Sequence, residues 1–195
     1  MNTSERSPPG TGERELDMNK EELLVNVATS AFAFEQDSHG CAQATVKALM
    51  DYFPIEKIVF KVASPCSGGI ANAGTGPCGG FLGGALVFGY FFGRDIQHRL
   101  ESGKNYKDRE LVNALRKKYY EHFGGLICRE VQNTVFGHSF DLFDPADRKR
   151  FEKEGGHEQV CPNVVAIAVK WITELLISEN VTPCQEYRFG EDFHL

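Results

Sequence analysis

The sequence predicts an all-α fold, a compact helical bundle, and three observations lead to this prediction. Apolar residues recur at helical spacing along most of the chain, as at Leu111, Leu115 and Tyr119. No segment shows the convincing alternation of apolar and polar residues that marks a half-buried strand. Glycine and proline stand near the ends of the helical segments, where they stop or start helices.

The N-terminal half contains four segments with a helical pattern. The second of them, residues 41–52, places its apolar and small side chains on one face. Pro54 suits the first turn of the short third helix, because its fixed backbone angle favours a helix start. The expected ranges are 19–34, 41–52, 55–63 and 78–93, with a loop rich in glycine, asparagine and proline at 64–77.

The C-terminal half contains two strong helical patterns separated by an irregular region. Residues 108–123 form the first, and the pair of glycines that follows stops it, which leaves Cys128 just past a helix end. Residues 161–178 form the second, with one continuous apolar stripe. The region 136–156 is expected to be an irregular excursion with a short helix at 145–151.

The 195 residues are expected to form one domain, because a chain of this length buries one sizeable core. Residues 19–180 form that domain, residues 1–18 a flexible N-terminal tail and residues 181–195 a C-terminal tail. The N-terminus lacks the apolar centre of a secretory signal, and the longest apolar run, 81–92, is shorter than a spanning helix of roughly 20 residues. We therefore expect a cytoplasmic protein with no membrane span.

Composition argues against several classes of function. The net charge is −6, from 21 basic and 27 acidic residues, and no run of Lys and Arg breaks that balance, so we expect no nucleic-acid partner. The glycine-rich GTGPCGG has no surrounding βαβ unit, which excludes a nucleotide site. No catalytic motif stands out, and the sequence indicates neither an enzymatic activity nor a substrate.

The six cysteines are the most informative residues. In a chain without a secretory signal, metal binding or redox chemistry is a more typical use of cysteine than a disulfide framework. Cys41, Cys78 and Cys161 are each predicted at a helix start, where free N–H groups and the helix dipole stabilise a thiolate. Arg129 beside Cys128 would act in the same sense.

The helix expected at 78–93 contains an unusual number of glycines for an apolar helix. Gly79, Gly80, Gly83, Gly84 and Gly89 each cost about 0.8–1 kcal/mol relative to alanine. Such a loss indicates that a neighbouring backbone or a cofactor packs close to this helix. A crowded helix crossing around a buried cysteine would explain the same pattern.

Four motifs resemble those of the C-GCAxxG-C-C family of redox-active proteins, which is related to the helical region of split-Soret cytochromes. They are HGCAQA (39–44), CGGFLG (78–83), CRE (128–130) and CP (161–162), and the resemblance runs from about residue 21 to residue 176. The family's four cysteines correspond to Cys41, Cys78, Cys128 and Cys161. The chain departs from the family in Gly80, where the motif has alanine, in its N-terminal tail and in the insertion at 136–156.

The resemblance implies that these four cysteines converge and bind an iron–sulfur cluster, for which the [2Fe–2S] type is expected. The function of the cluster would be electron transfer or redox sensing. The amides of Gly79 and Gly80 would face this cofactor. Two alternatives stay open: metal-free thiol–disulfide chemistry, with Cys41 and Cys78 as the pair, and a zinc-stabilised binding module that partners a transporter or a redox enzyme. A redox partner protein is expected in either redox case.

The remaining candidates have plainer interpretations. His39 is interpreted as a capping-loop histidine, with a role as a hydrogen-bond donor or substitute ligand as the alternative, and the other five histidines as surface or structural residues. Cys66 is either a buried small residue or an extra ligand or resolving thiol, and Cys184 is incidental. The aromatic residues of the glycine-rich helix belong to the core or to a homodimer interface: Phe88, Tyr90, Phe91 and Phe92.

Overall fold

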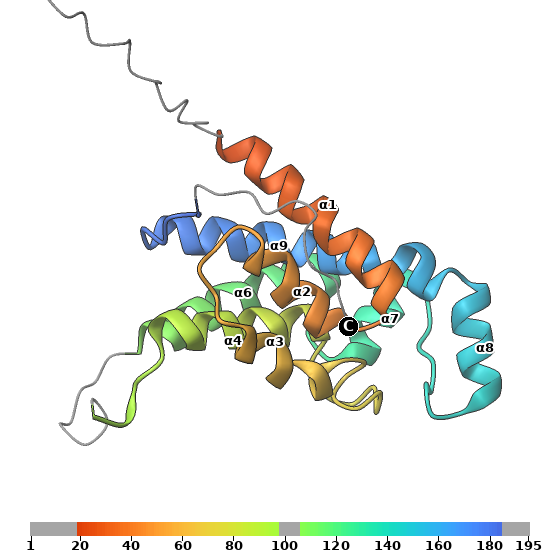
Figure 1. Cartoon of the computed structure of the whole chain (residues 1–195). Coiled ribbons are helices and arrows are strands. Elements are labelled where there is room, and N and C mark those ends of the chain that lie inside the picture. Colours follow the sequence, from red (N-terminus) through yellow and green to blue (C-terminus); the bar gives the residue numbers. More distant parts are fainter. Residues whose placement is uncertain (1–18, 98–105, 185–195) are drawn as a thin grey trace, which may run out of the picture.

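Helices account for all the regular secondary structure in the part of the chain that the computed structural model describes, residues 19–97 and 106–184 (Figure 1). Those residues contain eight α-helices, one 3₁₀ helix and one π-helix, and they contain no strand. The predicted all-α class is therefore confirmed. The tail expected at residues 1–18 and most of the one expected at 181–195 lie outside the described residues.

The helices follow the predicted order with modest changes at their ends. In the first half they are α1 (Lys20–Ser38), α2 (Cys41–Met50), α3 (Lys57–Val62), η1 (Ser64–Cys66) and α4 (Gly79–Phe92). In the second half they are α6 (Lys107–Phe123), α7 (Cys128–Phe136), α8 (Pro145–Lys153), the π-helix η2 (Gly156–Val160) and α9 (Cys161–Ser178). Helix α1 runs one turn beyond its expected end, to a left-handed cap at His39.

Helix α7 is absent from the sequence prediction, which placed Cys128 past a helix end; in the structure Cys128 begins this helix. Two local signals support it. The Glu130 carboxylate accepts hydrogen bonds from the backbone N–H groups of Leu126 and Ile127, at 3.1 and 3.0 Å, and Gly137 closes the helix in a left-handed conformation. The two glycines before Cys128 ended the expected helix pattern, but they separate two helices rather than opening a loop.

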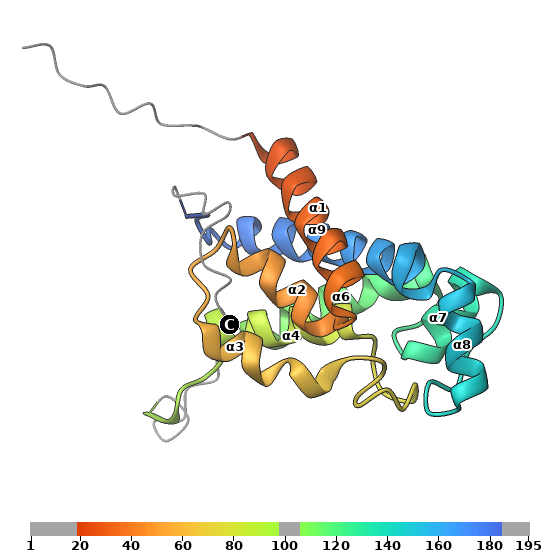
Figure 2. The ribbon, with the colours of Figure 1, turned by 45° about the vertical axis from the view of Figure 1, so that its right-hand side comes forward.

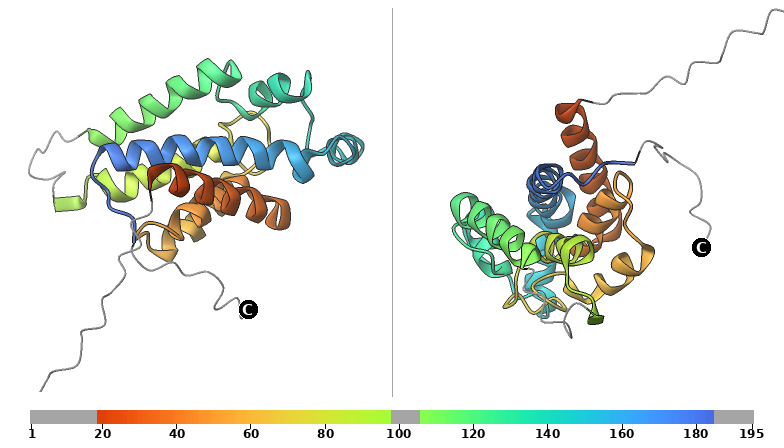
Figure 3. Two further views of the ribbon diagram at one scale, coloured as in Figure 1. Left: turned by 90° about the horizontal axis from the view of Figure 1, so that it is seen from above. Right: turned by 90° about the vertical axis from the view of Figure 1, so that its left-hand side faces the viewer.

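Helix α9 lies at the centre of the bundle, in contact with α1, α2, α4 and α6 (Figures 2 and 3). Residues 156–178 are long and apolar enough to cross a membrane. The sequence analysis compared only the run 81–92 with the length of a spanning helix and did not identify this segment. In the bundle, however, one face of α9 is buried, including Val165, Ala168, Val169 and Ile172. An apolar core helix passes the same composition test.

Close packing of α4 against its neighbours explains most of its glycines: Gly79 and Gly83 face α2, and Gly80 and Gly84 face α6 and α9. A methyl group at Gly83 would lie 2.6 Å from the Cβ of Thr45, and one at Gly84 would lie 2.7 Å from Ile172. Gly79 and Gly80 are equally crowded. Only Gly89 has open space around its Cα, with nothing within 4 Å. The expected close approach therefore occurs at four of the five glycines.

Candidate functional site

Cys41, Cys78, Cys128 and Cys161 line one cavity of about 40 Å³. Each lies at a helix start: Cys41 begins α2, Cys78 is the N-cap of α4, Cys128 begins α7 and Cys161 begins α9. Cys161 differs from the others because η2 precedes it, and its N–H group donates to the Gly156 carbonyl. Four helix starts that are far apart in sequence thus meet at one place.

A short backbone pairing brings Cys78 and Cys128 together. The Cys78 N–H group donates to the Leu126 carbonyl at 2.7 Å, and the Cys128 N–H group donates to the Gly76 carbonyl at 2.9 Å. Pro77 and Ile127 face each other between these bonds as an isolated antiparallel bridge. Because both amides are used in the pairing, the two cysteine N–H groups do not point at sulfur.

The loop between η1 and α4 covers another wall of the cavity with an unusual backbone. Residues 68–72 all have positive φ, between 50° and 74°, although three of them are not glycine. A non-glycine residue in this left-handed region costs roughly 1–2 kcal/mol, so contacts elsewhere must hold the loop. The Ser67 hydroxyl accepts from the Ala42 N–H group at 3.3 Å, and the Gly68 N–H group donates to the Cys41 sulfur. The strained loop thereby places an amide donor at a thiol.

Helix α4 supplies further donors to sulfur. The N–H groups of Gly80 and Phe81 donate to the Cys78 sulfur, and the buried Tyr119 hydroxyl lies 3.9 Å from it. Gly79 packs so closely on Cys41 that a methyl group there would overlap the Cys41 sulfur. The same methyl group would lie 2.8 Å from the Ala42 nitrogen. Both glycines therefore contribute to the site. Gly79 leaves room for the Cys41 sulfur because it has no side chain, and Gly80 donates its N–H group to the Cys78 sulfur.

Burial governs the thiol pKa values. Loss of solvation raises the pKa of Cys128 to about 12 and raises those of Cys41, Cys78 and Cys161 as well. Repulsion among the thiolates raises several of them further, while Arg129 lowers the pKa of Cys128 by a smaller amount. The expectation that helix starts would depress these pKa values is wrong for the metal-free protein, because desolvation outweighs the amide hydrogen bonds. Four such thiols become thiolates only when a cation joins them.

Glu35 is a site residue that the sequence analysis missed. Its side chain lines the cavity and is 2% exposed. Burial raises its pKa to about 8, although the Gly40 N–H group donates to its carboxylate and opposes the shift. Within the described residues, Oε2 has no hydrogen-bond partner. The signal was present in the sequence, because Glu35 continues the four-residue spacing of Leu23, Val27 and Ala31 on the buried face of α1.

Two histidines line the cavity where it approaches solvent. His39 is exposed and His157 is half-buried, and their rings stack with centroids 4.1 Å apart and planes at 3°. His157 Nδ1 also lies 2.9 Å from Glu152 Oε1. The sequence analysis treated both as ordinary capping or surface histidines, since residues 118 positions apart give no local signal of contact.

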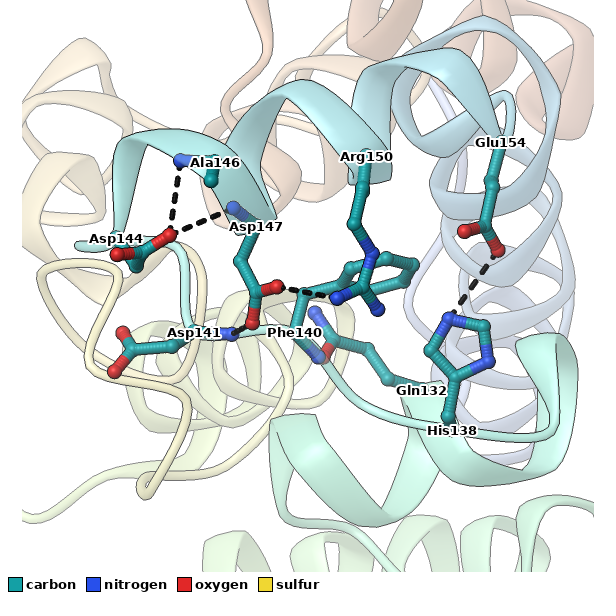
Figure 4. Close-up of polar contacts among 9 residues, drawn as sticks. All are labelled: Gln132, His138, Phe140, Asp141, Asp144, Ala146, Asp147, Arg150 and Glu154. Carbon is teal, nitrogen blue, oxygen red and sulfur yellow. Dashed lines mark hydrogen bonds and ion pairs between the residues drawn. The ribbon is translucent and has the colours of Figure 1, made fainter.

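Residues 137–156 form an insertion held together by polar contacts (Figure 4). His157, which follows the insertion, lines the cavity. The Phe140 N–H group donates to Gln132 Oε1 at 3.0 Å, and Gln132 itself lines the cavity. The Asp144 carboxylate caps α8 by accepting from Ala146 and Asp147 N–H groups at 2.9 and 2.8 Å. Phe140 and Phe151 are each 1% exposed and pack edge-on, so the insertion has a small core of its own. The region expected to be irregular is thus well organised; its short helix, expected at 145–151, runs from Pro145 to Lys153.

The other two cysteines are not among the residues that line the cavity. Cys66 is half-buried at the end of η1, and Cys184 is exposed; neither lines the cavity. The four cavity cysteines are free in the structure. Four thiols are the donor set of iron–sulfur clusters and of all-cysteine zinc sites. The chain's donors, the glycine cradle at Gly79 and the amides directed at sulfur suit such a group.

The fold and the cavity together define the molecule as a helical bundle in which four cysteines meet at one cavity. Residues 39–175, more than half of the chain, match the family described as "Putative redox-active protein (C_GCAxxG_C_C)". The chain therefore belongs to this family of redox-active proteins. Neither a curated protein nor a solved structure matches it.

Proposed function

We propose that Cys41, Cys78, Cys128 and Cys161 hold an iron–sulfur cluster, of the [2Fe–2S] type, and that the protein transfers electrons or senses redox state. The observation that carries the proposal is the meeting of all four cysteines at one cavity. Membership of a redox-active family supports redox chemistry rather than a purely structural role. A bound cluster of this type would accept and release one electron.

The chain's own groups would hold and tune this centre. The amides of Gly68, Gly80 and Phe81 donate to cysteine sulfurs and thereby favour the thiolate form. Hydrogen bonds to sulfur and exclusion of water are the protein's means of setting a cluster's potential. The Tyr119 hydroxyl near the Cys78 sulfur and the Glu35 carboxyl in the cavity lining would contribute to that tuning.

The raised thiol pKa values argue against the metal-free alternative. Thiol–disulfide exchange requires a thiolate, and buried thiols with a raised pKa react slowly. Cys41 and Cys78, the pair considered from the sequence, both have raised pKa values. A zinc centre would use the same four thiolates, so the metal itself must be measured.

The experiment is anaerobic purification followed by iron, sulfide and zinc analysis and by visible and electron paramagnetic resonance spectra. We expect about two irons and two sulfides per chain, and loss of both when any one of the four cysteines is replaced by serine. Cys66→Ser is the matched control, since Cys66 lies outside the cavity, and it should retain the cluster. Stoichiometric zinc without iron would sink the proposal in favour of the zinc-stabilised module.

The proposal extends to the setting of the protein. We place it in the cytoplasm with a redox partner protein, without nucleic acid and without a membrane span. The apolar residues 156–178 serve the bundle core in this proposal. Fractionation of cells and capture of the reduced protein's electron acceptor would test these points.

A further inference from the structure

A second group of ligand-type side chains lies beside the thiol cavity. It consists of His39, Glu152 and His157, and one ligand atom from each lies within 4.8 Å of the others. None of the three is a cysteine, and none belongs to the four-thiol set. Two imidazoles with one carboxylate are a recurrent ligand set for zinc and similar divalent ions.

Three different elements carry this group: the end of α1 carries His39, α8 carries Glu152 and η2 carries His157. His39 is the left-handed C-cap of α1, with φ 53°, and its N–H group donates to the Glu35 carbonyl at 3.0 Å. His157 lies in the π-helix η2, a type of helix that is frequent at functional sites. The Gln36 amide donates to the Glu158 carbonyl and ties the end of α1 to η2. The fold therefore fixes the backbone positions of the two histidines relative to each other.

The present distances are close to those that one ion requires. Two ligand atoms on a tetrahedral zinc ion lie roughly 3.4 Å apart, given bonds of about 2.0–2.2 Å. His157 Nδ1 and Glu152 Oε1 are 2.9 Å apart as a hydrogen-bonded pair, and an ion bound to both would displace the proton between them. The stacked imidazoles would have to tilt from their 3° alignment so that their lone pairs converge, which exposed His39 can do by side-chain rotation. Burial lowers the pKa of His157, while the neighbouring Glu152 carboxylate opposes that shift.

We propose that His39, Glu152 and His157 form a second metal site, for a divalent transition ion of the zinc class, at the solvent side of the thiol cavity. Three protein ligands leave at least one coordination position for water or an exogenous ligand, as in open zinc sites. The site goes beyond the proposed cluster, because it uses none of the four cysteines.

The test is a zinc titration of the full-length protein prepared without metal, in which the first equivalent of Zn²⁺ fills the cysteine centre. Calorimetry should record one further binding event per chain. His157→Gln, His39→Gln and the exposed Glu152→Gln should each weaken it at least tenfold. His138→Gln is the matched control, because His138 pairs with Glu154 at 3.2 Å without a third ligand, and it should leave the event unchanged. Long-range ¹H–¹⁵N spectra should show zinc-dependent shifts of His39 and His157 and none of His138.

Each outcome decides the proposal. Absence of a further event, or an event that survives the loss of both His39 and His157, overturns it. Weakening of the first, cysteine-based event by these variants also overturns it, since the histidines would then belong to the thiol centre. Retention of that first event shows that a variant is folded, and Glu152→Gln supplies an independent test if a histidine variant is not. Finding zinc rather than iron at the cysteines leaves this experiment unaffected.

Discussion

The two sides of the cavity differ in their exposure to solvent. The closed side is lined by Glu35, Cys41 and Cys78, with Gly79 packed on Cys41 and Tyr119 near Cys78. Of these, Glu35, Cys78 and Tyr119 are at most 7% exposed. The open side is lined by His39 and His157, with Glu152 beside His157, and His39 and Glu152 are exposed. The closed side is built from tightly crossing helices of the main core, and the open side rests on the small aromatic core of the insertion.

This difference in solvent exposure indicates which kind of metal centre each side can support. Buried thiols and amide donors suit an anionic sulfur centre shielded from solvent. Partly exposed imidazoles and a carboxylate suit an exchangeable divalent ion with an open position. The following predictions test whether substitutions on the closed side have larger effects than substitutions on the open side.

The largest effect is expected from Glu35→Gln, measured as the pH dependence of unfolding in the metal-free protein. Folding raises the pKa of Glu35 from 4.5 to about 8, so the unfolded chain releases this proton first. Wild-type stability should therefore fall by several kcal/mol as the pH rises from 4.5 to about 8, and Glu35→Gln should remove most of that slope. Equal slopes in urea titrations of the two proteins across this range would show that the carboxyl is not buried as described.

Gly79→Ala should be the most damaging small substitution on the closed side. The added methyl group overlaps the Cys41 sulfur and approaches the Ala42 nitrogen, so the crossing of α2 and α4 must open, at a cost of about 3 kcal/mol. Metal loading should fall with it. Gly89→Ala is the matched control in the same helix, where an exposed glycine has open space, and it should stabilise the protein by about 0.8–1 kcal/mol. Denaturant unfolding compares the two, and similar values would contradict the packing argument.

Asp144→Ala should have a smaller and more local effect on the open side. It removes both hydrogen bonds that cap α8, which costs about 1 kcal/mol. Hydrogen exchange should increase in α8 and in the Glu152–His157 region and stay unchanged in α4. Asp37→Ala, a change of the same residue type with no capping role in the structure, serves as a control. An equal rise of exchange in α4 would mean that the two sides unfold together.

Tyr119→Phe should have the smallest effect of the four. It removes only the hydroxyl 3.9 Å from the Cys78 sulfur, while the ring keeps its contacts with Phe81 and Trp171. Stability should change by less than about 1 kcal/mol. In the proposed cluster-loaded protein the reduction potential should shift to a more negative value, because a donor to sulfur is lost. An unchanged potential in protein-film voltammetry would remove Tyr119 from the centre.

The sequence by itself determined the helical class, most helix positions and the choice of the four cysteines. These features follow from local rules: apolar spacing, glycine and proline at helix ends, and motifs that span only a few residues. It also indicated the close approach at α4, because several glycines in one helix are too costly without a reason. The same local rules could have predicted helix α7, because Glu130 and Gly137 mark its ends. The prediction required that Gly124 and Gly125 be interpreted as a junction between two helices.

The tertiary structure alone decided which side chains meet. The buried place of Glu35, the stacking of His39 on His157 and the raised thiol pKa values all depend on residues that are far apart in the sequence. Burial reversed the local expectation that helix starts would favour thiolates. The physical reason is that desolvation depends on everything that surrounds a group in three dimensions, whereas capping and helix periodicity depend only on its neighbours along the chain.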